Sequence, residues 1–318
     1  MIKIKKIFLK NYCGYRNIEF DFTDKNDNVK QLAFLYGPNG TGKTSLLDAI
    51  NMCCNPLQYM NRNVDLLLSK IVYNIDYDPF ITDYEKQYAA QEERSGKTDV
   101  FTEKIKQETN TMDIAAYFMD DNNNDKFVIF TTQENQGVVQ NDLSVSESCL
   151  YFDADKPTSM NRFQLDIKKK DLFLDMAEMV YGFKCSFGHI VPVNMGTGES
   201  VDYYTDIVID KYGDRIHFKR MSAGEKKIAK LVQKLCSDEI EKQNIICIDN
   251  IFMHIYFKRH AKLIDKILDT YKNKQFILTC HSETAINHIE KKYGNKFLYD
   301  LEQYKIKDLN LTSSEIIS

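Results

Sequence analysis

The feature that most constrains the fold of this chain is a glycine-rich loop at residues 37–44, with the sequence GPNGTGKT. The loop matches the spacing G-x-x-x-x-G-K-[ST] in full. A continuous apolar run at 31–36 precedes it, and apolar residues recur with helical spacing over 44–54. The sequence therefore predicts a buried strand, a tight loop and a helix in that order, as in α/β proteins.

The residue types of this loop suit the phosphates of a nucleotide. Glycines let backbone N–H groups curl around phosphate oxygens, Lys43 adds a positive charge, and Thr44 offers a hydroxyl to Mg²⁺ at a helix N-terminus. We therefore predict that the chain binds ATP and Mg²⁺. The alternative is a glycine-rich turn without a ligand. The predicted nucleotide contacts in the loop are Asn39, Gly40, Thr41, Gly42, Lys43, Thr44 and Ser45.

Apolar periodicity predicts further strands and helices along the chain. The expected strands are 2–7, 18–22, 115–119, 127–132, 149–152, 201–210, 215–219, 245–248 and 275–279, with hairpins at 115–132 and 201–219. Helical spacing predicts helices at 223–241 and 256–272, and their alternation with strands indicates a parallel sheet. Residues 55–112 are polar with weak periodicity, so we expect a helical insertion there. The whole chain, 1–318, is expected to form a single domain.

Composition excludes several classes of protein. Hydrophobic residues make up 43% and charged residues 28%, as in globular proteins, and no run of 18 apolar residues could span a membrane. We expect no export signal, because the basic N-terminus alternates apolar residues with lysine as a strand does. The eight cysteines are scattered without a C-x-x-C pair, which indicates reduced thiols rather than a zinc site. We therefore expect a cytoplasmic protein without membrane contacts.

The charge balance also bears on nucleic acid as a partner. The formal net charge of −4 gives no overall attraction to a polyanion. A nucleic-acid contact would need a local basic patch, and the candidates are the lysines at 168–170 and the basic residues within 219–230. The alternative for both is ordinary solvated surface.

Three further elements each allow a structural and a functional interpretation. One apolar strand ends in Asp249, a position from which a carboxylate can hold Mg²⁺, although many buried strands end in aspartate without a metal. Ser222 lies three residues before Glu225 at a helix start, which by itself is a capping box. His281 follows the last expected strand, where a histidine is more often a hydrogen-bonded structural residue. The order of these elements along the chain is more informative than any one of them.

That order resembles a known family. The phosphate loop, the Ser-x-Gly-Glu element at Ser222, the strand that ends in Asp249 and the Thr-x-His-Ser element at His281 follow one another as in ATP-binding-cassette (ABC) ATPases. Within that group the chain resembles the SMC, RecF and OLD-type ATPases rather than the transporters. Residues 4–15 are similar to their first strand, and 36–50 to their phosphate loop and helix. The parts of the chain that the resemblance covers are 1–52 and 201–290.

The resemblance implies an α/β ABC-ATPase head, a P-loop NTPase with mixed and parallel sheets flanked by helices. It also implies that ATP and Mg²⁺ lie between two heads, with Lys43 and Thr44 on one side. The other residues to which it assigns roles are Ser222, Gly224 and Glu225 as nucleotide contacts from the second copy, Asp249 as a magnesium ligand besides Thr44, and His281 as the sensor of the γ-phosphate. Because the two half-sites of one chain cannot serve one nucleotide, we expect a homo-oligomer, at least a dimer, whose association depends on ATP.

The chain departs from the family pattern at its catalytic position. Asn250 stands where the family places a glutamate, and an amide cannot accept a proton from the attacking water. General-base assistance contributes about 10²- to 10⁴-fold, so we expect slow ATP hydrolysis. Cys13 also stands where relatives often carry Arg or Lys, and Arg16 is a candidate substitute. Residues 152–156, after a buried strand, are the candidate Q-loop.

These observations lead to a functional hypothesis with two alternatives. We expect an ATP hydrolase that oligomerises around ATP and regulates a separate effector, a nuclease or toxin, in antiviral defence or DNA repair. The effector is expected on another chain, because the residues after His281 are too few for a second enzyme domain. The first alternative is an ATP-dependent scaffold that does not hydrolyse, and the second is a DNA-binding repair or loader ATPase.

Overall fold

The computed structural model describes residues 1–55, 113–131, 138–141, 145, 147–156, 163–194, 200–305 and 307–308. Residues 56–112 lie outside the described residues, so the helical insertion expected at 55–112 remains a prediction, as does the single domain. The chain divides into two compact units. The first comprises Met1, Asp24–Pro38 and Glu147–Asp300, and the second comprises Ile2–Thr23, Asn39–Ser146 and Leu301–Ser318.

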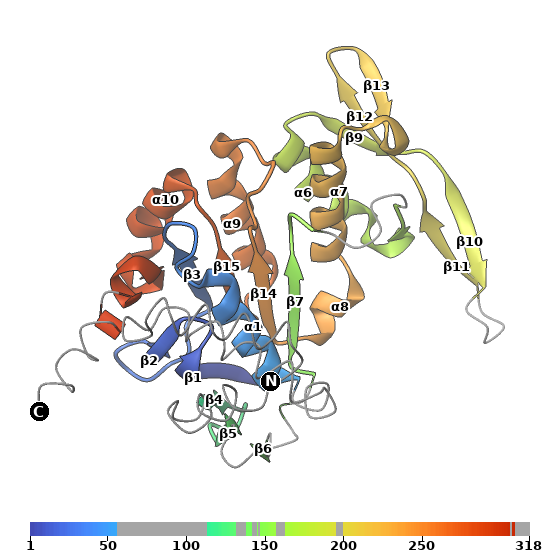
Figure 1. Cartoon of the computed structure of the whole chain (residues 1–318). Helices are drawn as coiled ribbons and strands as arrows, with labels where there is room; N and C mark the ends of the chain where they lie inside the picture. The colour runs from blue at the N-terminus through green and yellow to red at the C-terminus, as the bar shows by residue number, and fades with distance from the viewer. Residues whose placement is uncertain are drawn as a thin grey trace, which may run out of the picture. The chain divides into compact units, whose positions relative to one another are not determined.

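The first unit is built on a parallel sheet of five strands in the order β16-β3-β15-β14-β7 (Figure 1). The strands are β3 (Leu32–Tyr36), β7 (Cys149–Asp153), β14 (Ile245–Asp249), β15 (Gln275–Thr279) and β16 (Leu298–Asp300). Every residue of β14 and β15 is buried, which explains why both read as continuous apolar runs. The register pairs Asp249 with Asp153, so the carboxyl ends of β14 and β7 lie next to each other.

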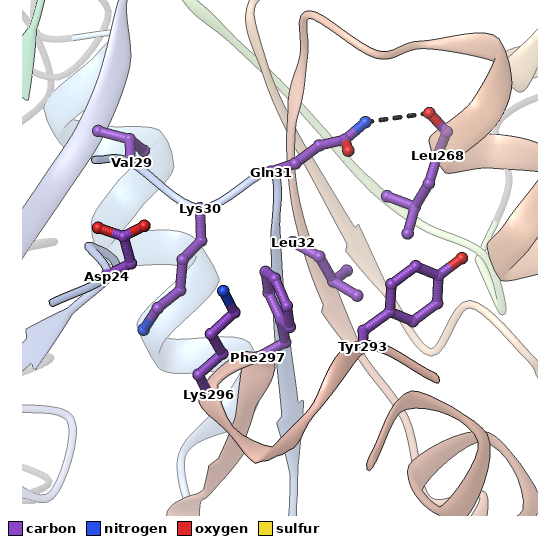
Figure 2. Close-up of a pocket in the computed structure, with 9 residues that line it drawn as sticks. All are labelled: Asp24, Val29, Lys30, Gln31, Leu32, Leu268, Tyr293, Lys296 and Phe297. Carbon is purple, nitrogen blue, oxygen red and sulfur yellow. Dashed lines mark hydrogen bonds between the residues drawn. The ribbon is translucent and has the colours of Figure 1, made fainter. Parts of the chain in front are cut away.

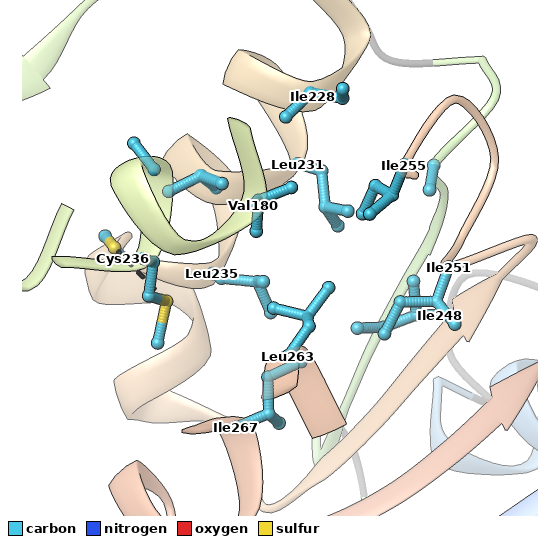
Figure 3. Packing of buried hydrophobic residues seen from close by; sticks show 14 of the residues in the cluster. Val180, Ile228, Leu231, Leu235, Cys236, Ile248, Ile251, Ile255, Leu263 and Ile267 are labelled. Carbon is cyan, nitrogen blue, oxygen red and sulfur yellow. Dashed lines mark hydrogen bonds between the residues drawn. The ribbon is translucent and has the colours of Figure 1, made fainter. Parts of the chain in front are cut away.

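Helices cover one face of this sheet and bury a single apolar core. They are α6 (Lys170–Tyr181), α7 (Ala223–Leu235), α8 (Asp238–Lys242), α9 (His260–Thr270) and α10 (Glu283–Tyr293). Figure 3 shows Leu231 and Leu235 of α7, Val180 of α6 and Leu263 of α9 gathered near Ile248 of β14. Fully burying each such side chain stabilises the fold by about 1.5–3 kcal/mol. This packing fixes the helices against the strands that end at the candidate site.

Two small antiparallel sheets complete the first unit. One has the order β10-β11-β8 and the other β13-β12-β9. Their strands are β8 (Leu165–Asp166), β9 (Lys184–Phe187), β10 (Ile190–Asn194), β11 (Ser200–Tyr204), β12 (Ile207–Lys211) and β13 (Asp214–His217). The predicted hairpin turn at 211–214 is confirmed, and Tyr212 and Gly213 both adopt positive φ there.

Two predicted elements of this unit are wrong in their extent. The strand expected at 201–210 is two strands in different sheets, because the Asp206 carboxylate accepts from His217 Nδ1 (2.6 Å) and the Phe218 N–H (3.1 Å) between them. The helix expected at 223–241 ends at Leu235, and α8 begins anew after Ser237. Ser237 before two acidic residues is a helix-start signal that breaks the pattern.

Short 3₁₀ turns connect several elements. They are η3 (Ile167–Lys169), η4 (Phe218–Arg220), η5 (Phe257–Arg259) and η6 (Asn295–Phe297). η4 separates β13 from α7, and η5 forms the first turn of the helix predicted at 256–272, whose α-helical part is α9.

The second unit contains an antiparallel sheet with the order β2-β1-β4-β5-β6 and the helix α1 (Lys43–Cys54). Its strands are β1 (Lys3–Tyr12), β2 (Tyr15–Asp21), β4 (Asp113–Met119), β5 (Asp125–Thr131) and β6 (Val138–Asn141). The predicted β4–β5 hairpin is confirmed, and Asn123 takes positive φ in its turn. α1 packs on β4 and β5.

All eight cysteines are free thiols, and seven of them are buried. Within the described ranges, no helix has both the length and the apolar character needed to cross a membrane.

Candidate functional site

The phosphate loop joins β3 to α1, as the sequence predicts. Gly42, directly before α1, has φ +90°, and a Cβ there would lie 2.5 Å from the Tyr15 hydroxyl oxygen. That hydroxyl donates to the Thr41 carbonyl at 3.2 Å. Both the backbone conformation and the contact with Tyr15 therefore require glycine at this position. Gly40 also has positive φ (+82°), so the loop has the sharp turns that a phosphate cradle needs.

The start of α1 has the properties expected of an anion-binding helix end. Its N-cap, Gly42, makes no side-chain hydrogen bond to the first turn, and no acidic residue lies there. Lys43 is buried (7% exposed), whereas Thr44 is exposed. An N-terminal turn without acidic residues and with a lysine suits a phosphate, because the helix dipole is positive there.

Asp249 ends β14 with its side chain almost fully buried, at 2% exposure. The hydroxyl of Thr279, the last residue of neighbouring β15, donates to Asp249 Oδ1. The same hydroxyl oxygen accepts from the Asn250 N–H at 2.9 Å. A buried carboxylate held in a fixed orientation fits the preference of Mg²⁺ for hard oxygen donors.

Asn250 is fixed in an uncommon backbone conformation. Its φ of +55° lies in the left-handed region, where asparagine is enriched over most other residues. Its side-chain Nδ2 donates to Asp153 Oδ1 at 3.4 Å, across the paired ends of β14 and β7. The asparagine therefore suits the local backbone, and its amide is directed towards a carboxylate.

The predicted capping box at the start of α7 is confirmed. The Glu225 N–H donates to Ser222 Oγ at 3.3 Å, and Glu225 Oε2 accepts from the Ser222 N–H (2.9 Å) and hydroxyl (2.8 Å). Lys211 Nζ lies 3.2 Å from Glu225 Oε1. Burial alone would raise the pKa of Glu225, but the bonds from Ser222 and Lys211 outweigh it and lower that pKa. Glu225 is therefore an ionised group that orders this helix start.

The sequence did not single out the neighbours of Gly224 and Lys227. A Cβ at Gly224 would lie 3.3 Å from His254 Nδ1, so the loop after β14 approaches the start of α7 closely. His254 Nε2 lies 3.0 Å from Asp155 Oδ1, and Lys227 Nζ of α7 lies 2.6 Å from the same oxygen. Asp155 falls inside the candidate Q-loop at 152–156, and His254 carries a positive φ (+69°).

His281 follows β15 and is exposed. Its neighbour Ser282 caps α10 by accepting from the Ala285 N–H at 3.2 Å. His260 Nδ1 lies 2.6 Å from Ser282 Oγ, and burial lowers the pKa of His260. His260 was not predicted as a site residue, although it lies three, four and seven residues before Leu263, Ile264 and Ile267 and therefore on the buried face of α9.

The structure thus gathers part of the predicted site within the first unit. Asp249, Asn250 and Thr279 lie together at the carboxyl edge of the sheet, with Asp153 beside them. Asn39, Gly40, Thr41, Gly42, Lys43, Thr44 and Ser45 belong to the second unit.

The candidate basic patch at 168–170 is partly neutralised. Lys169 Nζ lies 3.3 Å from Asp238 and also pairs with Glu241. This pairing removes one of the three charges from a polyanion contact.

A cavity of about 230 Å³ lies away from all predicted site residues, where β3 begins (Figure 2). Its lining residues are Asp24, Val29, Lys30, Gln31, Leu32, Leu268, Tyr293, Lys296 and Phe297. Gln31 Nε2 donates to the carbonyls of Leu268 (3.0 Å) and Tyr271 (3.2 Å). No motif in the sequence pointed to this cavity, because its residues come from segments far apart in the chain.

Comparisons with known proteins agree with this architecture. A family model described as "RecF/RecN/SMC N terminal domain" matches residues 3–301. Among solved structures, an SMC head bound to the C-winged helix domain of ScpA has a TM-score of 0.57 and 15% identity, with 90% of this chain and 91% of that chain covered. An SMC head domain of Pyrococcus furiosus with an extended coiled coil, bound to the C-terminal domain of ScpA, has a TM-score of 0.54 and 12% identity, with 91% and 92% covered. The predicted ABC-ATPase head fold is therefore confirmed.

Curated relatives match a shorter part of the chain. The Retron Vc95 probable ATPase of Vibrio cholerae serotype O1 biovar El Tor is 26% identical over 121 residues, which are 35% of this chain and 23% of that protein. The Retron Ec83 probable ATPase of Escherichia coli is 27% identical over 108 residues, which are 29% of this chain and 20% of that protein. The match therefore spans about a fifth of the length of these relatives.

Proposed function

We propose that this chain, which belongs to the RecF/RecN/SMC N-terminal domain family, binds ATP with Mg²⁺ and hydrolyses it slowly. The observation that carries the proposal is the polar group at the carboxyl ends of β7, β14 and β15, in the same parallel sheet whose β3 leads into the phosphate loop. Ligands of open α/β sheets bind outside the carboxyl ends of the strands. The loop geometry at Gly42 and the uncapped start of α1 support phosphate as the ligand.

Within this proposal the residues have distinct roles. Lys43 and the amides at the start of α1 bind the phosphates, and Thr44 and Asp249 hold Mg²⁺. The metal supplies charge neutralisation on the phosphates. His281 contacts the γ-phosphate. Asn250 orients groups at the site but accepts no proton.

We further propose that the site is shared between two copies of the chain. Ser222 and Gly224 of one copy contact the nucleotide of the other, while Glu225 holds the start of α7 in place through its capping bonds. The exposed position of Ser222 supports this role, because its backbone can be reached by a neighbour. The functional unit is then a homo-oligomer, at least a dimer.

Steady-state phosphate release by the purified chain with Mg-ATP tests the enzyme proposal. We expect slow release that Lys43→Ala abolishes, because the variant lacks the charge that holds the phosphates. Lys30→Ala, the same change outside the loop, is the matched control and should behave as wild type. Tight ATP binding without any release would instead support the non-hydrolysing scaffold. Absence of both binding and release would contradict the proposal.

The association proposal has its own measurement. Native mass determination with and without Mg-ATP should show a larger assembly only with the nucleotide. Lys43→Ala should remain in the smaller form in both conditions. A mass that ATP does not change would contradict ATP-dependent association.

A wider biological role follows from the names of the relatives. Because two retron probable ATPases resemble part of this chain, we propose that it regulates a separate effector, a nuclease or toxin, in antiviral defence or DNA repair. Affinity purification from cells that carry the native operon should yield a stoichiometric partner encoded beside this chain. Recovery of the chain without any partner, both with and without ATP, would contradict this role.

The DNA-binding alternative makes a different prediction. It requires a duplex affinity that falls steeply with salt and is weakened by charge reversal at residues 168–170. The ion pairs of Lys169 leave this patch with less free charge than the sequence indicated. Absence of binding at low salt with ATP present would exclude it.

A further inference from the structure

One carboxylate, that of Asp155, touches two segments that the proposed function assigns to different nucleotides. Its Oδ1 accepts from Lys227 Nζ at 2.6 Å and lies 3.0 Å from His254 Nε2. Lys227 lies on α7, whose start carries Ser222 and Gly224. His254 lies in the loop that follows Asp249 at the end of β14. Asp155 therefore links the start of α7 to that loop.

The segment that carries Asp155 is itself bonded to the end of β14. The Ala154 N–H donates to the Asp249 carbonyl at 2.9 Å, and Asn250 Nδ2 donates to Asp153 Oδ1 at 3.4 Å. The Asp155 N–H also donates to Asp153 Oδ1, at 2.8 Å. These three hydrogen bonds connect Asp249 and Asn250 to the segment that carries Asp155.

The loop between Asn250 and His254 has little freedom to absorb such a displacement. Both residues adopt left-handed backbone conformations, with φ of +55° and +69°. His254 also lies against Gly224, where a Cβ would come within 3.3 Å of its Nδ1. Non-glycine residues hold such conformations only when their surroundings fix them. The loop therefore forms a second connection between Asn250 and Gly224, through His254.

The ionised state of Asp155 favours its contacts with Lys227 and His254. Hydrogen bonds from Lys227 and then His254 lower the pKa of Asp155 below its usual value. The carboxylate consequently stays ionised at neutral pH and keeps both partners.

We propose that Asp155 is a positioning residue that couples the Asp249–Asn250 end of β14 to the Ser222–Gly224 start of α7. This inference rests on the proposed shared site, in which the first segment serves the chain's own nucleotide and the second serves the nucleotide of its neighbour. Through Asp155, ATP binding at one site of a dimer then changes the ATP affinity of the other site. Coupling between two sites is reciprocal and typically changes affinity by about 5- to 150-fold.

The test compares Asp155→Asn with Asp175→Asn. Both remove one carboxylate charge, and Asp175 lies on α6 with 60% side-chain exposure, where its carboxylate pairs with Lys266. Equilibrium ATP binding is measured at a protein concentration that keeps heads associated. We expect a Hill coefficient of about 1.4–1.9 for wild type and Asp175→Asn, as about 5- to 150-fold coupling of two sites gives, and of about 1 for Asp155→Asn. ATP affinity of dilute, separate heads should be the same in all three.

A second pair of variants tests the link without changing Asp155. His254→Gln keeps a donor that can reach the carboxylate, whereas His254→Leu removes it at similar size. We expect cooperative binding to survive in the first and to be lost in the second. If Asp155→Asn destabilises the fold and lowers the unfolding midpoint, the two His254 variants still test the coupling.

Two results would overturn the inference, and they differ from failure of the proposed function. Cooperative ATP binding in Asp155→Asn and His254→Leu, equal to wild type, would show that the link carries no coupling. Non-cooperative ATP binding by wild type would show that the two nucleotide sites are not coupled. Failure of wild type to bind ATP more tightly than Lys43→Ala would instead remove the proposed function itself.

Discussion

The two ends of the central parallel sheet hold polar side chains in different ways. At the carboxyl edge, Asp249, Thr279 and Asn250 are bonded to one another, and Asn250 reaches Asp153 on the next strand. At the amino edge, polar side chains line a cavity of about 230 Å³, and Gln31 there donates to the Leu268 carbonyl. Lys30 Nζ there donates to the Tyr299 hydroxyl at 3.0 Å.

This difference supports the carboxyl edge as the place of the proposed reaction. Groups that act on a transition state must be held in place before the substrate arrives, because fixing them during the reaction costs free energy. The carboxyl edge meets this condition, with a buried carboxylate oriented by a buried hydroxyl. At the amino edge, Asp24 orders its own turn by accepting from the N–H groups of Asn26 (2.8 Å) and Asn28 (3.0 Å).

The largest expected effect separates the two edges directly. Asp249→Asn removes the charge proposed to hold Mg²⁺ and should lower kcat by about 10³-fold. Asp24→Asn makes the same change at the amino edge and should leave kcat within about twofold. Phosphate release measures both. If both changes altered kcat equally, the two edges of the sheet would not differ in their part in the reaction.

The next effect concerns the residue that departs from the family pattern. Asn250→Glu supplies a proton acceptor and should raise kcat by about 10²-fold. The same change places a less suited residue at φ +55° and should cost about 1 kcal/mol of unfolding free energy. Phosphate release and urea denaturation report the two effects separately. An unchanged kcat, with ATP still bound, would show that proton transfer does not limit the rate.

A smaller effect sharpens the account of how the carboxyl edge is ordered. Thr279→Val keeps the shape of the side chain but leaves Asp249 Oδ1 and the Asn250 N–H without this buried partner. We expect a loss of about 1–3 kcal/mol in the free energy of unfolding. Urea denaturation measures it, and a neutral result would mean that the hydroxyl does not hold these groups.

The smallest effect is expected at the amino edge. Lys30→Met removes the bond to Tyr299 at a part-exposed position, so the free energy of unfolding should change by no more than about 0.5 kcal/mol. Phosphate release should equal that of wild type. A marked loss of turnover would show that the cavity at this edge takes part in the reaction.

Local sequence patterns were sufficient for much of the fold. Strands β3, β14 and β15 appear where apolar runs predicted them, and the turn at Tyr212 and Gly213 also appears as expected. Continuous burial and positive φ restrict which residue types can stand at a position, so both can be recognised in the sequence. The phosphate loop and the capping box at Ser222 were predictable for the same reason. Each depends on neighbours within a few residues.

Features that depend on distant residues could not be predicted in this way. The break at Asp206 arises because its carboxylate turns back to His217 and Phe218, and the periodicity of 201–210 gives no sign of it. Asp155, Lys227 and His254 are separated by many residues, and nothing local relates them. The register of β14 with β7, which brings the ends of these strands together, is a tertiary property.

The shared nucleotide site is the central claim, and mixing two inactive variants tests it most directly. Lys43→Ala removes the phosphate-binding lysine, and Ser222→Arg blocks the start of α7, so neither should release phosphate alone. A mixed dimer has one site with an intact loop from the second variant and an intact α7 start from the first. The account predicts that mixing restores phosphate release above either variant alone. A mixture as inactive as its components, in which mixed dimers are shown to form, would contradict it.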